Sequence, residues 1–171
     1  MNISGGASRR NRWGTQLRWG GVLLIMLGLT LPGFAALGGT VDSVAEDQAH
    51  MRATMSITHS AQFSVHELKT GSRLVIREYV SEDGRVFGVA WQGPFLPDMQ
   101  QILGTYFQQY SVAAQEARKA QDVQTRSFGR RPLSIREPGL VVDSSGHLRA
   151  HAGRAYDPSL LPDGVSADVI R

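Results

Sequence analysis

The chain has 171 residues, with 18 Lys and Arg against 15 Asp and Glu, five His and no Cys. This length suits one domain with short extensions, and the lack of Cys excludes disulfides, thiolate metal sites, iron–sulfur clusters, thiol catalysis and lipoprotein acylation. The positive charge is concentrated at the start, because residues 1–35 hold four arginines and no acid, which leaves 14 basic and 15 acidic residues in the remainder. This balance argues against a nucleic-acid-binding protein, since phosphate neutralisation requires clustered cations.

The first 35 residues have the pattern of a secretory signal peptide. A polar segment with arginines precedes the apolar run Gly21–Leu31, which is much shorter than the ~20 residues of a membrane-spanning helix. Pro32 and Gly33 then break the helix, and Gly33 and Ala35 provide the small residues that signal peptidase needs at −3 and −1. We therefore predict cleavage after Ala35, or alternatively after Ala36, and a periplasmic or secreted protein. An uncleaved leader that anchors the chain in the inner membrane is the alternative.

After the leader, the pattern predicts a short helix and then an antiparallel meander. Residues 40–55 carry a loose apolar face at helical spacing, and a connection is expected over 56–61. Three runs rich in β-branched and aromatic residues follow at 63–68, 73–80 and 86–92. Turn sequences separate these runs, and Asp83-Gly84 suits the positive φ of a tight hairpin, so the strands should pair antiparallel.

The next segment predicts one long amphipathic helix. Pro97 and Asp98 suit a helix start, and the apolar residues over 98–115 follow the i, i+3, i+4, i+7 spacing. This helix should lie across one face of the meander. The polar segment 116–131 is interpreted as the helix end and a linker.

The C-terminal part predicts further strands and a tail. Strands are expected at 133–136, 140–143 and 147–155, with a turn at 144–146. Residues 157–171 contain Pro and Gly and little apolar content, which is typical of a flexible tail. The predicted fold class is α+β, with an antiparallel meander of about three strands plus a C-terminal hairpin, packed by the long helix and a short N-terminal helix. The predicted domain spans 36–156.

Few residues in the chain suggest a binding or metal site. Trp91, Tyr106 and Tyr110 are candidates for a ligand-facing aromatic cluster, although a stripe that packs the core explains the same spacing more simply. His147 and His151 lie four residues apart in a segment that alternates like a strand, which would separate the two rings by ~13 Å. We therefore predict no metal site. We also predict no cofactor, because the chain has no phosphate-binding glycine motif.

Catalytic patterns are equally sparse. The chain lacks the serine-nucleophile elbow of hydrolases, and no catalytic residue is assigned. Glu67 and Glu78 fall on adjacent predicted strands and could face each other as a buried acid pair with one raised pKa. The plainer alternatives are that Arg73 or Arg77 neutralises them or that both face water.

Several motifs between residues 36 and 110 carry a family resemblance. They are Ala36-Leu37-Gly38-Gly39, Val65-His66-Glu67, Arg77-Glu78-Tyr79-Val80, Gly84–Pro94, Leu96-Pro97-Asp98, Gln101, Leu103-Gly104 and Tyr106-Phe107, and the most specific run is Val-Ala-Trp-Gln-Gly-Pro at 89–94. This stretch resembles a bacterial family of exported proteins defined only as a domain of unknown function, number 2844. The resemblance implies export, a single small domain and a setting in the bacterial envelope. It implies no activity and no catalytic residue.

These observations predict a small exported protein that works by binding, as an accessory or structural factor. Its expected partner is an envelope protein or peptide, and no nucleic acid; a short antiparallel sheet with an open edge can accept a strand from such a partner. The alternative is an envelope enzyme or ligand-binding protein with a cleft between the helix 98–115 and the sheet. A pocket lined by Trp91 and Tyr106 would favour this alternative, whereas a filled core beside a bare sheet edge would favour the binding protein.

Overall fold

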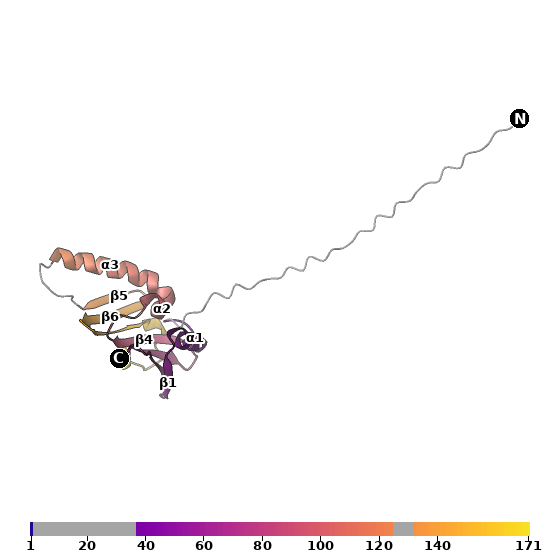
Figure 1. Ribbon diagram of the computed structural model, residues 1–171, viewed down its shortest axis with the longest axis horizontal. Helices are drawn as coiled ribbons and strands as arrows, with labels where there is room; N and C mark the ends of the chain where they lie inside the picture. Colours follow the sequence, from indigo (N-terminus) through magenta and orange to yellow (C-terminus); the bar gives the residue numbers. More distant parts are fainter. Residues whose placement is uncertain (2–36, 125–131) are drawn as a thin grey trace. The chain divides into compact units, whose positions relative to one another are not determined.

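The computed structural model describes Met1 and residues 37–124 and 132–171, so the predicted leader, with Ala35 and Ala36, lies outside the described residues. The described helices and strands all belong to one unit, residues 31–171. Seven strands form one antiparallel sheet in the order β1-β2-β3-β4-β7-β6-β5 (Figure 1). They are β1 (Thr54–His59), β2 (Phe63–Lys69), β3 (Val75–Ser81), β4 (Val86–Gly93), β5 (Leu133–Glu137), β6 (Leu140–His147) and β7 (Ala150–Tyr156).

The α+β class is confirmed, and the three predicted central runs correspond to β2, β3 and β4. The sheet is larger than predicted because the C-terminal strands continue it, with β7 pairing antiparallel to β4. Trp91 of β4 lies directly opposite Gly153 of β7, and a Cβ atom at Gly153 would overlap the indole ring. Glycine at this position therefore allows the largest core side chain to lie against the joining strand.

Strand β1 is the element that the sequence prediction missed. The segment 56–61 was predicted to be a connection, whereas Thr54–His59 pairs with β2 over six residue pairs. Met55 and Ile57 alternate with hydroxyl-bearing residues in this strand, which is the pattern of a half-buried strand, but the run is short and little of it is buried. The hairpin closes where the Ser60 N–H donates to the Phe63 carbonyl oxygen at 2.8 Å.

Three α-helices lie on one face of the sheet: α1 (Val41–Met51), α2 (Met99–Leu103) and α3 (Phe107–Gln124) (Figure 1). The helix starts at Asp98 as predicted, and the structure shows that Asp98 caps α2, since its Oδ1 accepts from the N–H groups of Gln100 and Gln101. The predicted helix 98–115 is interrupted at Gly104, whose φ of 50° ends α2 before a 3₁₀ turn, η1 (Gly104–Tyr106), leads into α3. No helix in the described part of the chain is both long and apolar enough to cross a membrane.

The turn between β6 and β7 differs from the prediction. Residues 144–146 were expected to form it, but they belong to β6 and pair with β7, and the chain reverses at Leu148-Arg149, where Arg149 has a φ of 61°. Gly146 lies in β6 and not in a turn. The lack of a side chain there makes room for the ring of His151 on the paired strand, which a Cβ at position 146 would overlap.

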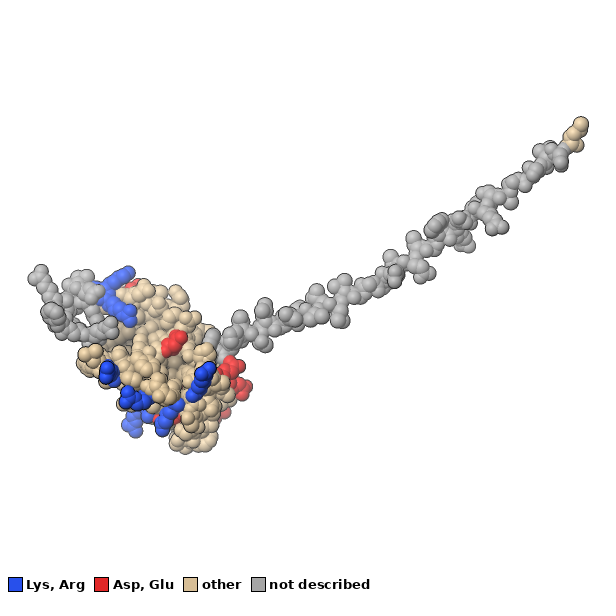
Figure 2. Space-filling view, in the orientation of Figure 1, with Lys and Arg blue, Asp and Glu red and all other residues tan. Residues whose placement is uncertain are grey.

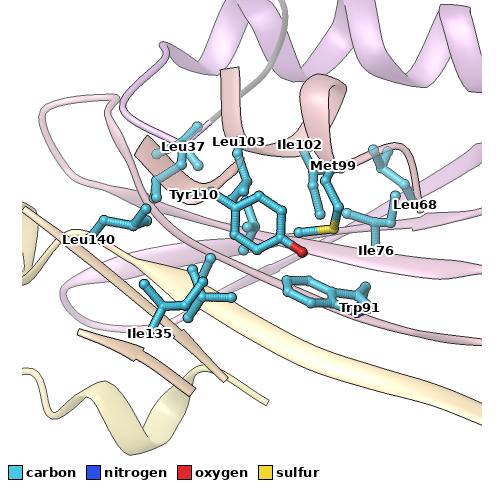
Figure 3. Close-up of a cluster of buried hydrophobic side chains, with 14 of the residues drawn as sticks. Leu37, Leu68, Ile76, Trp91, Met99, Ile102, Leu103, Tyr110, Ile135 and Leu140 are labelled. Carbon is cyan, nitrogen blue, oxygen red and sulfur yellow. The ribbon is translucent and has the colours of Figure 1, made fainter. Parts of the chain in front are cut away.

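The helix face of the sheet is covered by the main core. Side chains of the sheet and of α1, α2 and α3 interdigitate between the two layers, as Figure 3 shows. The labelled side chains are all buried: Leu37, Leu68, Ile76, Trp91, Met99, Ile102, Leu103, Tyr110, Ile135 and Leu140.

The second face of the sheet is covered by the C-terminal segment, residues 157–171. The prediction of a flexible tail is therefore corrected: Ile170 has 0% exposure and packs with Tyr79, Phe87 and Ala90 in a second core. The close fit depends on Gly88, where a Cβ would lie 2.6 Å from Ile170 Cδ1. The segment docks because apolar side chains on this face of β2, β3 and β4 would otherwise be exposed to water.

Candidate functional site

The three aromatic candidates do not form a ligand cluster in this structure. Trp91 and Tyr110 are 2% and 6% exposed and belong to the main core between the helices and the sheet (Figure 3). Ile102 and Leu103 fill the same space. The space that the predicted cleft would need is thus occupied by buried side chains.

Tyr106 instead joins the helix layer to the C-terminal segment. Its hydroxyl donates to Asp157 Oδ2, while Asp157 Oδ1 accepts from the Ser159 N–H at 2.8 Å. Burial, and then the hydrogen bond to Asp157, raise the pKa of Tyr106 to about 12, so its hydroxyl stays protonated as a donor. For Asp157, burial acts to raise the pKa, but the hydrogen bonds from Tyr106 and Ser159 lower it overall. The contact therefore joins a neutral phenol to an ionised carboxylate.

A buried acid pair lies under α1. Glu78 of β3 has 0% exposure and Asp47 of α1 has 1%. Burial, and then the charge of Asp47 and a hydrogen bond with it, hold the pKa of Glu78 well above its ordinary value of 4.5. Gln101 Nε2 donates to Asp47 Oδ1 at 2.8 Å, so two polar groups approach the carboxyl of Asp47. The surroundings of Glu78 therefore favour the neutral, protonated form of its carboxyl group.

His66 is the cross-strand neighbour of Glu78 on the same face of the sheet. It is 5% exposed, and its Nε2 lies 3.1 Å from Ser64 Oγ. Burial, and then the charge of His59, lower the pKa of His66, which favours the neutral ring. In the described residues no group of three or more acidic, histidine or cysteine side chains is placed to hold a metal ion.

The register of the β2–β3 pairing determines whether Glu67 and Glu78 lie opposite each other. Glu78 lies opposite His66, whereas Glu67 lies opposite Arg77. The possibility that Glu67 and Glu78 face each other is excluded, because adjacent strand positions point to opposite faces, and the plainer alternative of neutralisation by Arg77 holds for Glu67. Glu67 instead binds Lys69 at 2.8 Å and Arg77 at 2.7 Å, and hydrogen bonds from these two side chains lower the pKa of Glu67 despite partial burial.

Two arginines bind the end of the C-terminal segment on the second face. Arg77 Nη1 donates to the Arg171 carbonyl oxygen at 3.2 Å, and Arg154 Nη1 donates to the Ala167 carbonyl oxygen at 3.0 Å. The Tyr79 hydroxyl donates to the same Arg171 oxygen and accepts from the Arg171 N–H. These hydrogen bonds bind main-chain atoms of the segment at Ala167 and Arg171. The apolar side chain of Ile170 packs on the sheet between these two positions.

Two surface pockets adjoin this segment. Trp91 belongs to the lining of the first pocket, whereas Tyr106 and Tyr110 line neither. The first has a volume of about 450 Å³ and lies where β4, β7, β6 and β5 meet Ile170 and Arg171. The second has about 490 Å³ and lies between the β3–β4 turn and residues 159–163. Three charged groups in the lining of the first pocket have ion-pair partners, since Arg154 Nε lies 3.3 Å from Asp143 and Arg77 binds Glu67.

The histidine pair of the sequence is separated by the hairpin. His147 ends β6 and His151 lies on β7, opposite Gly146. Because His147 is one position removed from Gly146, the two rings point to opposite faces of the sheet. The two histidines therefore lie on different strands, β6 and β7, and not on the single strand that was expected.

Among the described strands, β1 pairs with β2 alone, so its outer edge presents main-chain groups without a strand partner. Every β1 residue except Met55 is exposed, and Ile57 is 44% exposed. Edge strands are normally shielded by Lys, Pro, a bulge or a covering element, but β1 contains no Asp, Glu, Lys or Arg, no Pro and no break in register. In Figure 2 the lowest part of the molecule, where Figure 1 places β1, is uncharged surface, with Lys and Arg side chains beside it.

Sequence reasoning missed both Asp47 and the β1 edge. Asp47 stands at helical spacing between Val44 and Met51 on the apolar side of α1, and an acid in such a stripe is a signal for a buried polar contact. The alternation of Met55 and Ile57 with Thr and Ser was the corresponding signal for a strand.

These features define a small α+β protein whose helix–sheet interface is filled and whose sheet ends in an open strand. The chain belongs to the family described as Protein of unknown function (DUF2844), whose model matches residues 33–170. No curated protein and no solved structure matches the chain.

Proposed function

We propose that this protein is exported to the periplasm or beyond and acts there by binding, as an accessory or structural factor without catalysis. It engages its partner, an extended segment of an envelope protein, by main-chain pairing at the edge of β1. The observation that carries this proposal is the open, regular and unprotected β1 edge.

Export is supported by the arginine-bearing start, the short apolar run and the small residues before Ala36. The catalytic alternative required a cleft between α2–α3 and the sheet. Buried Trp91, Ile102 and Tyr110 occupy that position, so the geometry favours a binding surface over an enclosed site.

Fractionation of cells that produce the full chain tests export. The soluble exported fraction should contain a chain whose intact mass corresponds to a start at Ala36 or Leu37. A chain that retains Met1, or one that stays in the cytoplasm, would contradict this part of the proposal.

A photo-crosslinking amino acid placed at Ile57 tests the binding surface in living cells. It should give discrete protein adducts, because a strand added to β1 would lie about 5 Å away. The same amino acid at Val112, which is 49% exposed on α3, is the matched control and should give none. Absence of any adduct from position 57 would reject β1 as the binding edge.

A further inference from the structure

We propose that the strand added to β1 is β1 of a second copy of this chain, paired antiparallel about a two-fold axis at Ile57. This inference rests on the proposed binding role of the β1 edge and names its partner. The two seven-stranded sheets would join into one continuous sheet with the helices of both copies on the same side.

The main-chain groups available for this pairing follow from the β1–β2 hairpin. Ser60 and Phe63 form a hydrogen-bonded pair, with the Ser60 N–H donating at 2.8 Å. Hydrogen-bonded pairs alternate along an antiparallel ladder, so Thr58, Ser56 and Thr54 direct their N–H and C=O groups toward β2. Met55, Ile57 and His59 therefore direct theirs away from the sheet, toward the open edge.

One register uses all of these outward groups. With Ile57 opposite Ile57 of the second copy, Met55 of each copy lies opposite His59 of the other, and every outward N–H and C=O has a partner. A register centred on Ser56 places Met55 opposite Ile57 and leaves His59 opposite Ala53, which lies outside the strand. The pairing centred on Ile57 thus satisfies more main-chain groups, and buried unpaired main-chain groups are costly.

The side chains agree with the same register. Ile57 is 44% exposed, and pairing covers it with an identical apolar side chain. On the opposite face, Ser56 of each copy meets Thr58 of the other, which is a favourable cross-strand hydroxyl pair. Self-pairing brings no like charges directly together, because no Asp, Glu, Lys or Arg lies in the strand.

The other end of the sheet is less suited to self-pairing. Strand β5 lies beside α3 and carries Arg136 and Glu137 in its short run. Such charged positions are a common device that discourages edge-to-edge association. The β5 edge therefore carries charged side chains, whereas the β1 edge contains no Asp, Glu, Lys or Arg.

Single-cysteine substitutions test the register, because the chain has no Cys of its own. Paired Cα atoms across a hydrogen-bonded antiparallel pair are about 5.5 Å apart, within the range for a disulfide. The Ile57→Cys chain should therefore oxidise to a covalent dimer. The His59→Cys chain, whose two copies would be separated by about 14 Å along the strand, should not do so alone but should crosslink when mixed with the Met55→Cys chain.

Charge substitutions test the same axis without crosslinking. By light scattering after size exclusion, the parent chain should be dimeric, and Ile57→Lys or Ile57→Glu alone should weaken the dimer about tenfold or more. Mixing the two variants should restore it, because the opposite charges would meet at the axis. Val112→Lys is the matched control and should leave the dimer unchanged, and circular dichroism verifies folding of each variant.

The outcomes separate this inference from the proposed function. A parent chain that stays monomeric, or equal crosslinking of the Ile57→Cys and His59→Cys chains, overturns self-pairing at Ile57. An in-cell adduct from position 57 whose mass is not twice that of the chain also overturns it, while leaving the β1 edge as the binding surface. No adduct at all rejects both.

Discussion

Replacing Glu78 with Gln should remove a pH dependence of folding that arises from the buried acid pair. Glu78 has 0% exposure and shares its environment with Asp47, and its pKa is held well above 4.5 by burial and then by Asp47. In the unfolded chain both carboxyls meet water. The folded state therefore retains a proton that the unfolded state releases.

The sign and size of the effect follow from this difference. Because the folded pKa of Glu78 is raised, its contribution is most favourable below pH 4.5 and is lost as the pH rises toward the folded pKa. One retained proton changes the free energy of unfolding by about 1.4 kcal/mol per pH unit within that window. Glutamine imitates the protonated acid and cannot ionise, so the stability of Glu78→Gln relative to the parent should increase at that rate.

The measurement is urea denaturation of both chains at several pH values between 5 and 8. His66 acts in the opposite direction, because its lowered pKa makes stability fall below pH 6.5, but it is present in both chains and cancels in the difference. Glu82→Gln, at an exposed position in the β3–β4 turn, is the control and should run parallel to the parent. A constant difference in the free energy of unfolding between Glu78→Gln and the parent across this range would refute the raised pKa of Glu78.

Three further changes test the packing. Trp91→Ala should cost about 3–5 kcal/mol in urea denaturation, because it empties the largest core position; a near-neutral effect would mean that Trp91 is not a core residue. Ile170→Ala should cost about 2–4 kcal/mol and increase amide hydrogen exchange over 157–171, and unchanged exchange would contradict the docking of this segment. Tyr106→Phe removes the donor to Asp157 and should cost about 1.5 kcal/mol; equal midpoints for Tyr106→Phe and the parent would show that the contact is weak.

The parts of the fold that follow from local signals were predictable. The hairpin at Asp83-Gly84 formed as expected, with a Gly84 φ of 80°, and Asp98 begins α2. Such features depend on residues close in sequence, so their physics is contained in a short window. The helix break at Gly104 also has a local cause, the positive φ of this glycine. It was not predicted, because the apolar residues before and after Gly104 keep the spacing of one continuous helix.

Features that depend on register were not predictable from the sequence. Glu67 and Glu78 each lie in a strand that was correctly expected, but a one-residue change in pairing decides whether they meet. Where β4 pairs with β7, Trp91 lies opposite Gly153, a residue distant in the chain. No local pattern specifies either relation.

The docking of residues 157–171 could have been inferred by asking what covers each face of the predicted meander. Its strands are apolar on both sides: Ile76 and Val80 point toward the helices, while Val65 and Tyr79 point the other way. One amphipathic helix can cover only one face, so the second required another segment. Leu160, Leu161, Val165, Val169 and Ile170 were the apolar residues left in the chain to provide it, and those residues form the cover. The low apolar content of residues 157–171 was therefore a poor indicator of flexibility. The segment approaches the sheet closely at Gly88, so a few apolar side chains are enough to cover this face.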